Sequence, residues 1–198
     1  ARQHRRIVVA DDRGEARRGF IDDRRDQRRL ATGPCAPIDG AALEWRLESF
    51  HRPYHAALAA ALTAARNEYG HAILIDLHSM PSIPAGQPGH GARIIVGDRF
   101  GETAGDWLID LAVASAERLN QPVARNQPYA GGHIIRTHGR PAEAVHAVQI
   151  EIDRSLYLTP GRLPDAARIA RLARWFSNLV AAAGYARPDT EIFAQAAE

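Results

Sequence analysis

The chain has 198 residues, of which 45 % are hydrophobic and 24 % charged, with a net charge of +2. This size and balance predict one globular domain over residues 1–198 with a sizeable core. No membrane-spanning apolar stretch or secretory-type leader occurs, and a single cysteine excludes an intramolecular disulfide and a zinc ribbon, so we expect a cytoplasmic protein with no membrane partner.

The first thirty residues are rich in arginine, with acidic residues interleaved among the arginines. Such a segment is typical of a solvated chain end, and we expect residues 1–40 to be poorly ordered. A basic segment can also bind nucleic acid. The aromatic interleaving typical of nucleic-acid binders is missing here, so we expect no nucleic-acid partner.

Apolar periodicity divides the rest of the chain into alternating helices and strands. A helical stripe runs over 41–69, where Pro53 should kink or restart the helix and Gly70 should end it. Buried strands are predicted at 72–77, 92–98, 122–126 and from 144, and further helices at 103–119 and 165–183, the last with Asp165 as its N-cap. Short strands are also predicted at 5–9 and 19–22. This alternation predicts an α/β fold with a mixed, mostly parallel sheet flanked by helices.

Polar residues stand near the ends of four predicted strands: His78, Asp98, Asn126 and Glu151. In α/β sheets, ligand sites gather at the carboxyl ends of the strands. We therefore expect these four residues to belong to one site.

His78 follows a buried strand and has Asp76 two residues before it, on the same face. An imidazole in this position can bind a metal or carry a proton, and a neighbouring carboxylate can orient it. The same pattern is typical of a core histidine whose ring bonds to a backbone carbonyl. The stretch by itself leaves both interpretations open.

Glu151 lies in the segment VQIEID, where strand alternation places Val148, Ile150 and Ile152 on one face and Glu151 on the other. Burial of an unpaired carboxylate is costly and raises its pKa toward the range that suits a general base. A strand with one solvated face would show the same pattern, so this alternative also stays open.

Other features of the chain permit several roles. Gly131 and Gly132 would let the backbone approach a ligand, or would only form a tight turn. The nearby arginines could hold a carboxylate or form surface ion pairs. His133, His138 and His146 show no recognisable metal-ligand spacing. The chain has no glycine-rich phosphate loop and no G-x-S-x-G or H-E-x-x-H motif, which argues against nucleotide-dependent, serine-hydrolase and common metalloprotease chemistry.

Five segments, taken in order, resemble the N-formylglutamate amidohydrolase family: HRPYHAAL, LIDLHSMPS, IVGDRFG, ARNQPYAGGHIIRTHG and VQIEIDRSLY. The resemblance runs from about residue 50 to residue 180. It implies a zinc-carboxypeptidase-like (phosphorylase/hydrolase-like) fold. It also implies hydrolysis of N-formyl-L-glutamate to formate and L-glutamate, a step of histidine degradation.

The resemblance implies roles for individual residues. His78 matches the last zinc-ligand histidine of the family, and Glu151 matches the glutamate that acts as general base on a zinc-bound water. The acidic N-acyl amino acid would be held by arginines, with two neutral partners: Arg25, Arg99, Arg136, Arg154, Asn126 and Tyr129. Arg25 rests on a weaker match over GFIDDRRDQ.

The resemblance also predicts that this chain is an N-terminally truncated relative. The family takes its first two zinc ligands, a histidine and a glutamate, from a preceding segment, and His4 has no acid at the needed position. A catalytic zinc normally has three protein ligands, so one histidine would hold it weakly. Two interpretations follow: a zinc-dependent amidohydrolase, or a non-catalytic homologue that binds an acidic amino acid without metal.

Overall fold

The structure is a computed structural model that describes residues 8–11 and 39–186. The predicted strand at 19–22, most of residues 1–40 and Arg25 lie outside these ranges. None of the described helices has the length and apolar character needed to cross a membrane. The elements in chain order are β1 (Val8–Asp11), α2 (Gly40–Arg46), the π-helical turn η2 (Leu47–His51), α3 (Arg52–Tyr69), β2 (Ala72–Met80), β3 (Ile94–Gly97), α4 (Asp106–Glu117), β4 (Val123–Arg125), α5 (His133–His138), the short 3₁₀ turn η3 (Pro141–Glu143), β5 (Val145–Asp153), the 3₁₀ turn η4 (Arg154–Leu156) and α6 (Ala166–Tyr185).

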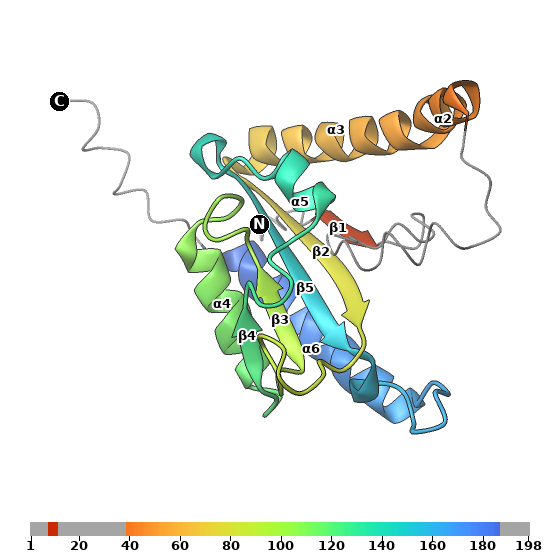
Figure 1. The fold of residues 1–198 in the computed structure, drawn as a ribbon. Helices are drawn as coiled ribbons and strands as arrows, with labels where there is room; N and C mark the ends of the chain where they lie inside the picture. The colour runs from red at the N-terminus through yellow and green to blue at the C-terminus, as the bar shows by residue number, and fades with distance from the viewer. Residues whose placement is uncertain (1–7, 12–38, 187–198) are drawn as a thin grey trace.

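The strands form one sheet in the order β1-β2-β5-β3-β4 (Figure 1). β1, β2 and β5 run parallel to one another, and β3 and β4 run parallel to each other. Only the β3–β5 pair in the middle is antiparallel. The mixed, mostly parallel sheet flanked by helices is therefore confirmed.

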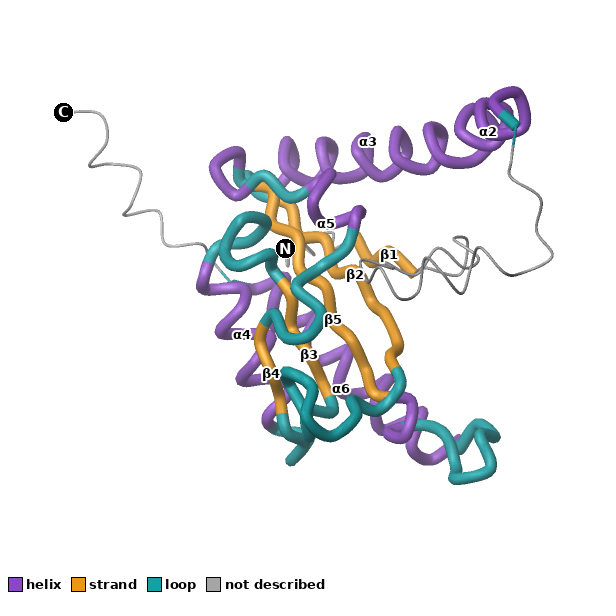
Figure 2. The backbone as a smooth tube through the Cα atoms, in the orientation of Figure 1, coloured by secondary structure: helices purple, strands orange, loops and turns teal. Residues whose placement is uncertain are grey.

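Helices cover both faces of the sheet (Figure 2). On the α4/α6 face, odd residues of β2 and even residues of β5 pack against α4 and α6 in the main core, where Leu108, Ile150 and Leu179 are almost fully buried. On the α3/α5 face, Leu74 of β2 packs with Leu62 of α3 and helix α5 in a second core. Both faces of β2 and β5 are therefore buried where the helices lie.

The long helical segment before β2 is divided as Pro53 predicts. A π-helical turn ends at His51, and α3 follows with Pro53 in its first turn. The backbone stays helical through this junction, so the wider π turn accommodates Pro53. Gly70 ends α3 in the left-handed conformation with φ 82°. The predicted apolar stripe is only partly buried, because α2 and the start of α3 extend past the sheet and leave Trp45 and Phe50 exposed (Figure 1).

The two main departures from the sequence predictions concern the end of β2 and the helix α5. β2 continues to Met80 because it stays paired with β5 along its whole length. The helix α5 follows the two glycines directly and was not predicted, since six residues are too few to show helical periodicity. Asp165 is confirmed as the N-cap of α6, where its side chain accepts a hydrogen bond from the Arg168 N–H.

Candidate functional site

A group of polar side chains lies on the α3/α5 face at the carboxyl ends of two central strands. Asp76 and His78 come from β2, and Gln149 and Glu151 come from β5. The parallel register pairs Asp76 with Gln149 and His78 with Glu151. Because residues two apart share a face, all four side chains meet beyond the apolar part that α3 and α5 cover. We call these four residues the β2/β5 site.

His78 lies between two carboxylates in this site. Its Nε2 is 3.0 Å from Asp76 Oδ1, and its Nδ1 is 3.9 Å from Glu151 Oε1. The Asp76 side chain is 1 % exposed, whereas 23 % of the His78 side chain is reached by solvent. The imidazole therefore joins a buried acid to a surface that a small molecule can reach. The alternative of a solvated strand face at Glu151 is excluded, since every residue of β5 is buried.

Glu151 has the altered acidity that its position in the sequence predicts. Burial raises the pKa of Glu151, and the Asp76 carboxylate adds to the rise. The opposing influences on this pKa come from His78, from the Gln149 amide and from Arg154. Gln149 Nε2 donates a hydrogen bond of 3.0 Å to Glu151 Oε1, which holds the carboxylate in place. A carboxylate with a raised pKa is a stronger base than an ordinary one, which suits the acceptance of a proton.

The prediction that four strand ends meet at one edge of the sheet is wrong for Asp98 and Asn126, which follow strands that run opposite to β5. A substrate contact of Asn126 stays a prediction. Because β3 runs antiparallel to β5, Glu151 pairs with Ile95, and Asp98 lies three residues further along. At about 3.3 Å per residue, this separates Asp98 from Glu151 by roughly 10 Å along the strand. The carboxyl ends of β3 and β5 therefore point in opposite directions, although Gly97, the last residue of β3, pairs with Gln149.

Asp98 and Asn126 instead anchor a loop. Asn126 Nδ2 donates to Asp98 Oδ1 at 2.6 Å, and the Asp98 N–H donates to Asn126 Oδ1 at 2.9 Å. Arg125 Nη2 is 2.9 Å from Asp98 Oδ2, which neutralises a carboxylate that is fully buried. These bonds fix the start of the loop that covers residues 126–132.

That loop brings Tyr129 and a backbone donor to the β2/β5 site. The Gly132 N–H donates a 2.7 Å hydrogen bond to Gln149 Oε1. Burial raises the pKa of Tyr129, and the nearby charge of Glu151 raises it further. A side chain at Gly97 would collide with the Ala130 backbone, so a residue without Cβ is what lets the loop cross the end of β3. Gly132 in this loop thus supports the site through its backbone.

The predicted substrate arginines have separate surroundings. The positive charge of Arg154 acts to lower the pKa of Glu151, and Arg154 Nη2 donates to the Ser79 carbonyl at 3.3 Å. Arg99 pairs with Glu102 at 3.0 Å, and Arg136 Nη2 is 3.2 Å from His133 Nδ1. Of the described arginines that we predicted, Arg154 is the one whose charge reaches the β2/β5 site. Substrate contacts of all these arginines stay predictions.

A second group of chemically active side chains was missed from the sequence. One ring nitrogen each of His51, His55 and His133 lies within 4.8 Å of the other two. The spacing of His51 and His55 in HRPYH, four residues apart on a helix, is the signal that could have indicated it. Sequence spacing could not join His133 to them, because α5 reaches α3 only in the folded chain.

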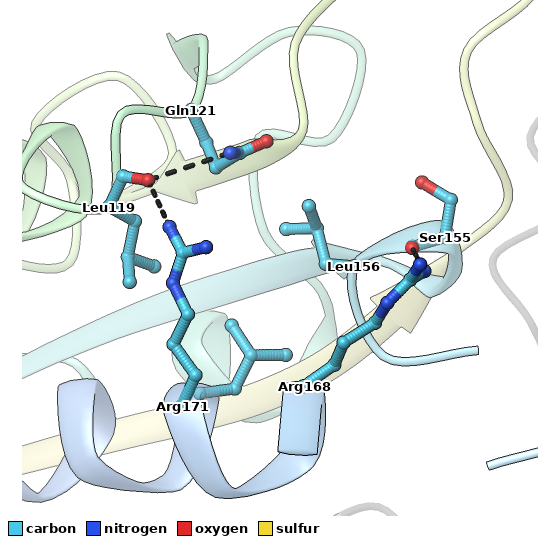
Figure 3. Close-up of a pocket in the computed structure, with 7 residues that line it drawn as sticks. Leu119, Gln121, Ser155, Leu156, Arg168 and Arg171 are labelled. Atoms are coloured by element: carbon cyan, nitrogen blue, oxygen red, sulfur yellow. Dashed lines mark hydrogen bonds between the residues drawn. The ribbon is translucent and has the colours of Figure 1, made fainter. Parts of the chain in front are cut away.

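The described surface also has a pocket of about 170 Å³ beside α6. Figure 3 shows Arg168 and Arg171 extending from α6 toward the segments around Ser155 and Leu119. Arg171 Nη2 donates to the Leu119 carbonyl at 2.5 Å, and Arg168 Nη1 donates to the Ser155 carbonyl at 3.3 Å. These hydrogen bonds hold α6 to η4 and to the segment after α4. His78 and Glu151 do not line this pocket.

Comparison with known proteins agrees with the geometry. A profile of the N-formylglutamate amidohydrolase family matches residues 5–158. N-formylglutamate deformylase of Pseudomonas putida is 36 % identical over 114 residues, which cover 57 % of this chain and 43 % of the relative. The same enzyme of Pseudomonas aeruginosa is 33 % identical over 110 residues, or 54 % of this chain and 41 % of the relative. The chain thus spans less than half the length of these two relatives.

Solved structures have the same fold. The crystal structure of N-formylglutamate amidohydrolase from Ralstonia eutropha JMP134 matches with a TM-score of 0.64 and 35 % identity, over 73 % of this chain and 53 % of that one. A gene product of Agrobacterium tumefaciens matches with a TM-score of 0.54 and 23 % identity, over 72 % of this chain and 54 % of that one. This second match supports the fold alone. On the extent of the family match, this chain belongs to the N-formylglutamate amidohydrolase family.

Proposed function

We propose that this chain hydrolyses N-formyl-L-glutamate, or a close N-acyl amino acid, to formate and L-glutamate. Family membership supports this proposal, since the relatives from both Pseudomonas species are N-formylglutamate deformylases. The observation that carries it is the pairing of His78 with Glu151, whose carboxylate is buried and has a raised pKa. A zinc-carboxypeptidase-like fold, a cytoplasmic location and a place in histidine degradation are the finer parts of the same proposal.

Glu151 would move the proton in this reaction. Water attacks the formyl carbonyl, and Glu151 accepts the proton that the water loses. The C–N bond then breaks, and Glu151 returns the proton to the departing amine. Burial favours the first of these two proton transfers, because a raised pKa makes Glu151 a stronger base. The hydrogen bond from Gln149 Nε2 keeps one carboxylate oxygen oriented throughout.

We propose zinc as the cofactor, with His78 as one ligand. Nδ1 of His78 faces Glu151 while Nε2 faces Asp76, and a carboxylate behind a histidine is how ligand imidazoles are commonly oriented. Zinc would polarise the carbonyl and acidify the attacking water. Within the described ranges, however, no group of three metal-ligating side chains includes His78, so the usual set of three ligands is not completed there.

Arg154 is the described arginine best placed to hold a substrate carboxylate. Its charge already influences Glu151, and its side chain is exposed, so it can turn from the Ser79 carbonyl toward a ligand. Tyr129 lies on the loop over the same site and offers a neutral hydroxyl. A dicarboxylate needs more than one cation, and Arg25, Arg99 and Arg136 are the other candidates that we propose.

The second candidate function is binding without catalysis. Among the described residues the ligand set around His78 is incomplete, which favours this function, because a chain without zinc would still keep the arginines and Tyr129. Such a homologue would bind an acidic amino acid and release no formate.

Formate release from N-formyl-L-glutamate tests the two candidates. We expect Glu151→Gln to lower kcat by about 10²–10⁴-fold with little change in KM, because the variant keeps the shape and loses the base. The matched control is Glu117→Gln on the exposed surface of α4, which should keep full activity. If calorimetry shows binding of N-formyl-L-glutamate and no formate is released, the result would refute hydrolysis and support the binding function. Absence of both binding and hydrolysis would refute both candidates.

A further inference from the structure

Three histidines, one each from η2, α3 and α5, meet beside the α3/α5 face. His51 ends the π-helical turn, His55 lies one turn later in α3, and His133 begins α5. The ring centroids are 4.4 Å apart for His51–His55, 5.1 Å for His55–His133 and 5.6 Å for His51–His133. One nitrogen of each ring lies within 4.8 Å of the others, which is close enough for small side-chain movements to bring all three onto a single ion.

We propose that His51, His55 and His133 bind one divalent transition-metal ion of the class that prefers imidazole ligands, such as Zn²⁺, Co²⁺, Ni²⁺ or Cu²⁺. Three neutral imidazoles with an open fourth position are a known ligand set for such ions. This site uses none of the residues of the β2/β5 site, and it does not depend on the proposed hydrolysis.

The strongest support comes from His55. Its Nε2 is buried and has no hydrogen-bond partner among the described residues. A buried nitrogen without a partner is unfavourable, and a metal ion would satisfy it. The two other ligand rings are half-buried beside it, so the converging nitrogens are partly shielded from water.

His138 provides the partner that an imidazole ligand needs on its far side. His138 Nε2 is 2.8 Å from His55 Nδ1, and the two rings stack at an interplanar angle of 16°. With Nδ1 of His55 occupied in this way, Nε2 is the nitrogen left for the ion. Hydrogen bonds of this kind fix the tautomer and the orientation of ligand histidines.

In the metal-free state the Arg136 guanidinium lies beside a proposed ligand nitrogen, where its positive charge would compete with the ion. Its Nη2 is 3.2 Å from His133 Nδ1, while Thr137 Oγ1 is 3.3 Å from His133 Nε2. The guanidinium is exposed and can move away, which would leave Nδ1 for the metal and Nε2 as a donor to Thr137. Removal of this positive charge should therefore tighten metal binding, which a purely structural histidine cluster would not show.

The test is a titration of the chelator-treated full chain with Co²⁺, followed by calorimetry and by visible absorption. The His78→Ala variant serves as the background, so that the β2/β5 site cannot contribute an ion. We expect one Co²⁺ per chain and a rise in the thermal unfolding temperature with Co²⁺ concentration, because an ion that binds only the folded state stabilises it.

Further substitutions in this background assign the ligands. His51→Ala, His55→Ala and His133→Ala should each weaken Co²⁺ binding at least tenfold, and Arg136→Gln should strengthen it. His90→Ala is the matched control, since His90 is exposed and its Nδ1 bonds to the Ile83 carbonyl. His51→Ala keeps the test decisive if a more buried variant fails to fold, because alanine suits a helix. The proposal is overturned if the background chain binds no Co²⁺, or if the three histidine variants bind it as the control does.

Discussion

His146 makes the stability of this protein depend on pH in a way that can be calculated. The side chain is buried at the start of β5, and its Nδ1 accepts a 3.0 Å hydrogen bond from the Gly105 N–H that precedes α4. Burial, together with the smaller effect of the nearby His71, lowers the pKa of His146 from 6.5 to about 4. The folded protein therefore keeps this imidazole neutral at pH values where an unfolded chain would protonate it.

The size of the effect follows from the two pKa values. Between pH 6.5 and pH 4 the unfolded chain binds a proton that the folded chain does not bind, so the free energy of unfolding falls as the pH is lowered through this window. From pH 7.5 to pH 5.0, His146 should remove about 2 kcal/mol. For a protein of this length that corresponds to about 4–8 °C in Tm.

Urea unfolding at pH 7.5 and pH 5.0 measures this loss. His138, whose pKa is also lowered to about 4, contributes to the wild-type loss, so the comparison with His146→Gln isolates His146. The variant should lose about 2 kcal/mol less than the wild type over the same interval. An NMR titration of the His146 ring gives the folded pKa directly. A midpoint at or above 6.5, or equal losses in variant and wild type, would refute the reasoning.

Two further predictions concern buried contacts that support the sheet and the β2/β5 site. Asp153 is fully buried and accepts hydrogen bonds from Ser82, Arg93 and the Ser155 N–H, which outweigh burial and hold the pKa of Asp153 below its usual value. Asp153→Ala should lower the free energy of unfolding in urea by about 1–3 kcal/mol, because it leaves the Ser82 hydroxyl and the Ser155 N–H without their acceptor; the exposed control Asp110→Ala should change little, and a loss as small as the control's would contradict the prediction. Gly97→Ala would place Cβ 2.8 Å from the Ala130 carbonyl carbon. Cβ atoms do not approach backbone atoms this closely, so the loop backbone would have to shift. We expect a loss of about 1–3 kcal/mol in the same assay together with weaker protection of the Gly132 amide from hydrogen exchange; Gly40→Ala, which meets nothing within 4 Å, is the control, and unchanged protection of Gly132 would show that Gly97 does not position the loop.

Periodic and local signals in the sequence predicted much of this protein. Alternation in VQIEID placed Glu151 opposite Val148 and Ile150, and the structure confirms both the arrangement and the raised pKa of Glu151. Asp165 and Gly70 marked helix ends correctly because capping depends on residues next to each other in the chain. The ordered motifs also predicted the family, which the comparisons confirm.

The tertiary structure alone decided how distant segments meet. The strands before Asp98 and Asn126 run opposite to β5, while the pairing of β2 with β5 brought His78 to Glu151. The packing of α5 on α3 likewise joined His133 to His51 and His55. Periodicity records which face of an element is apolar, but the order and direction of strands depend on contacts between residues far apart in the chain, which local sequence does not encode.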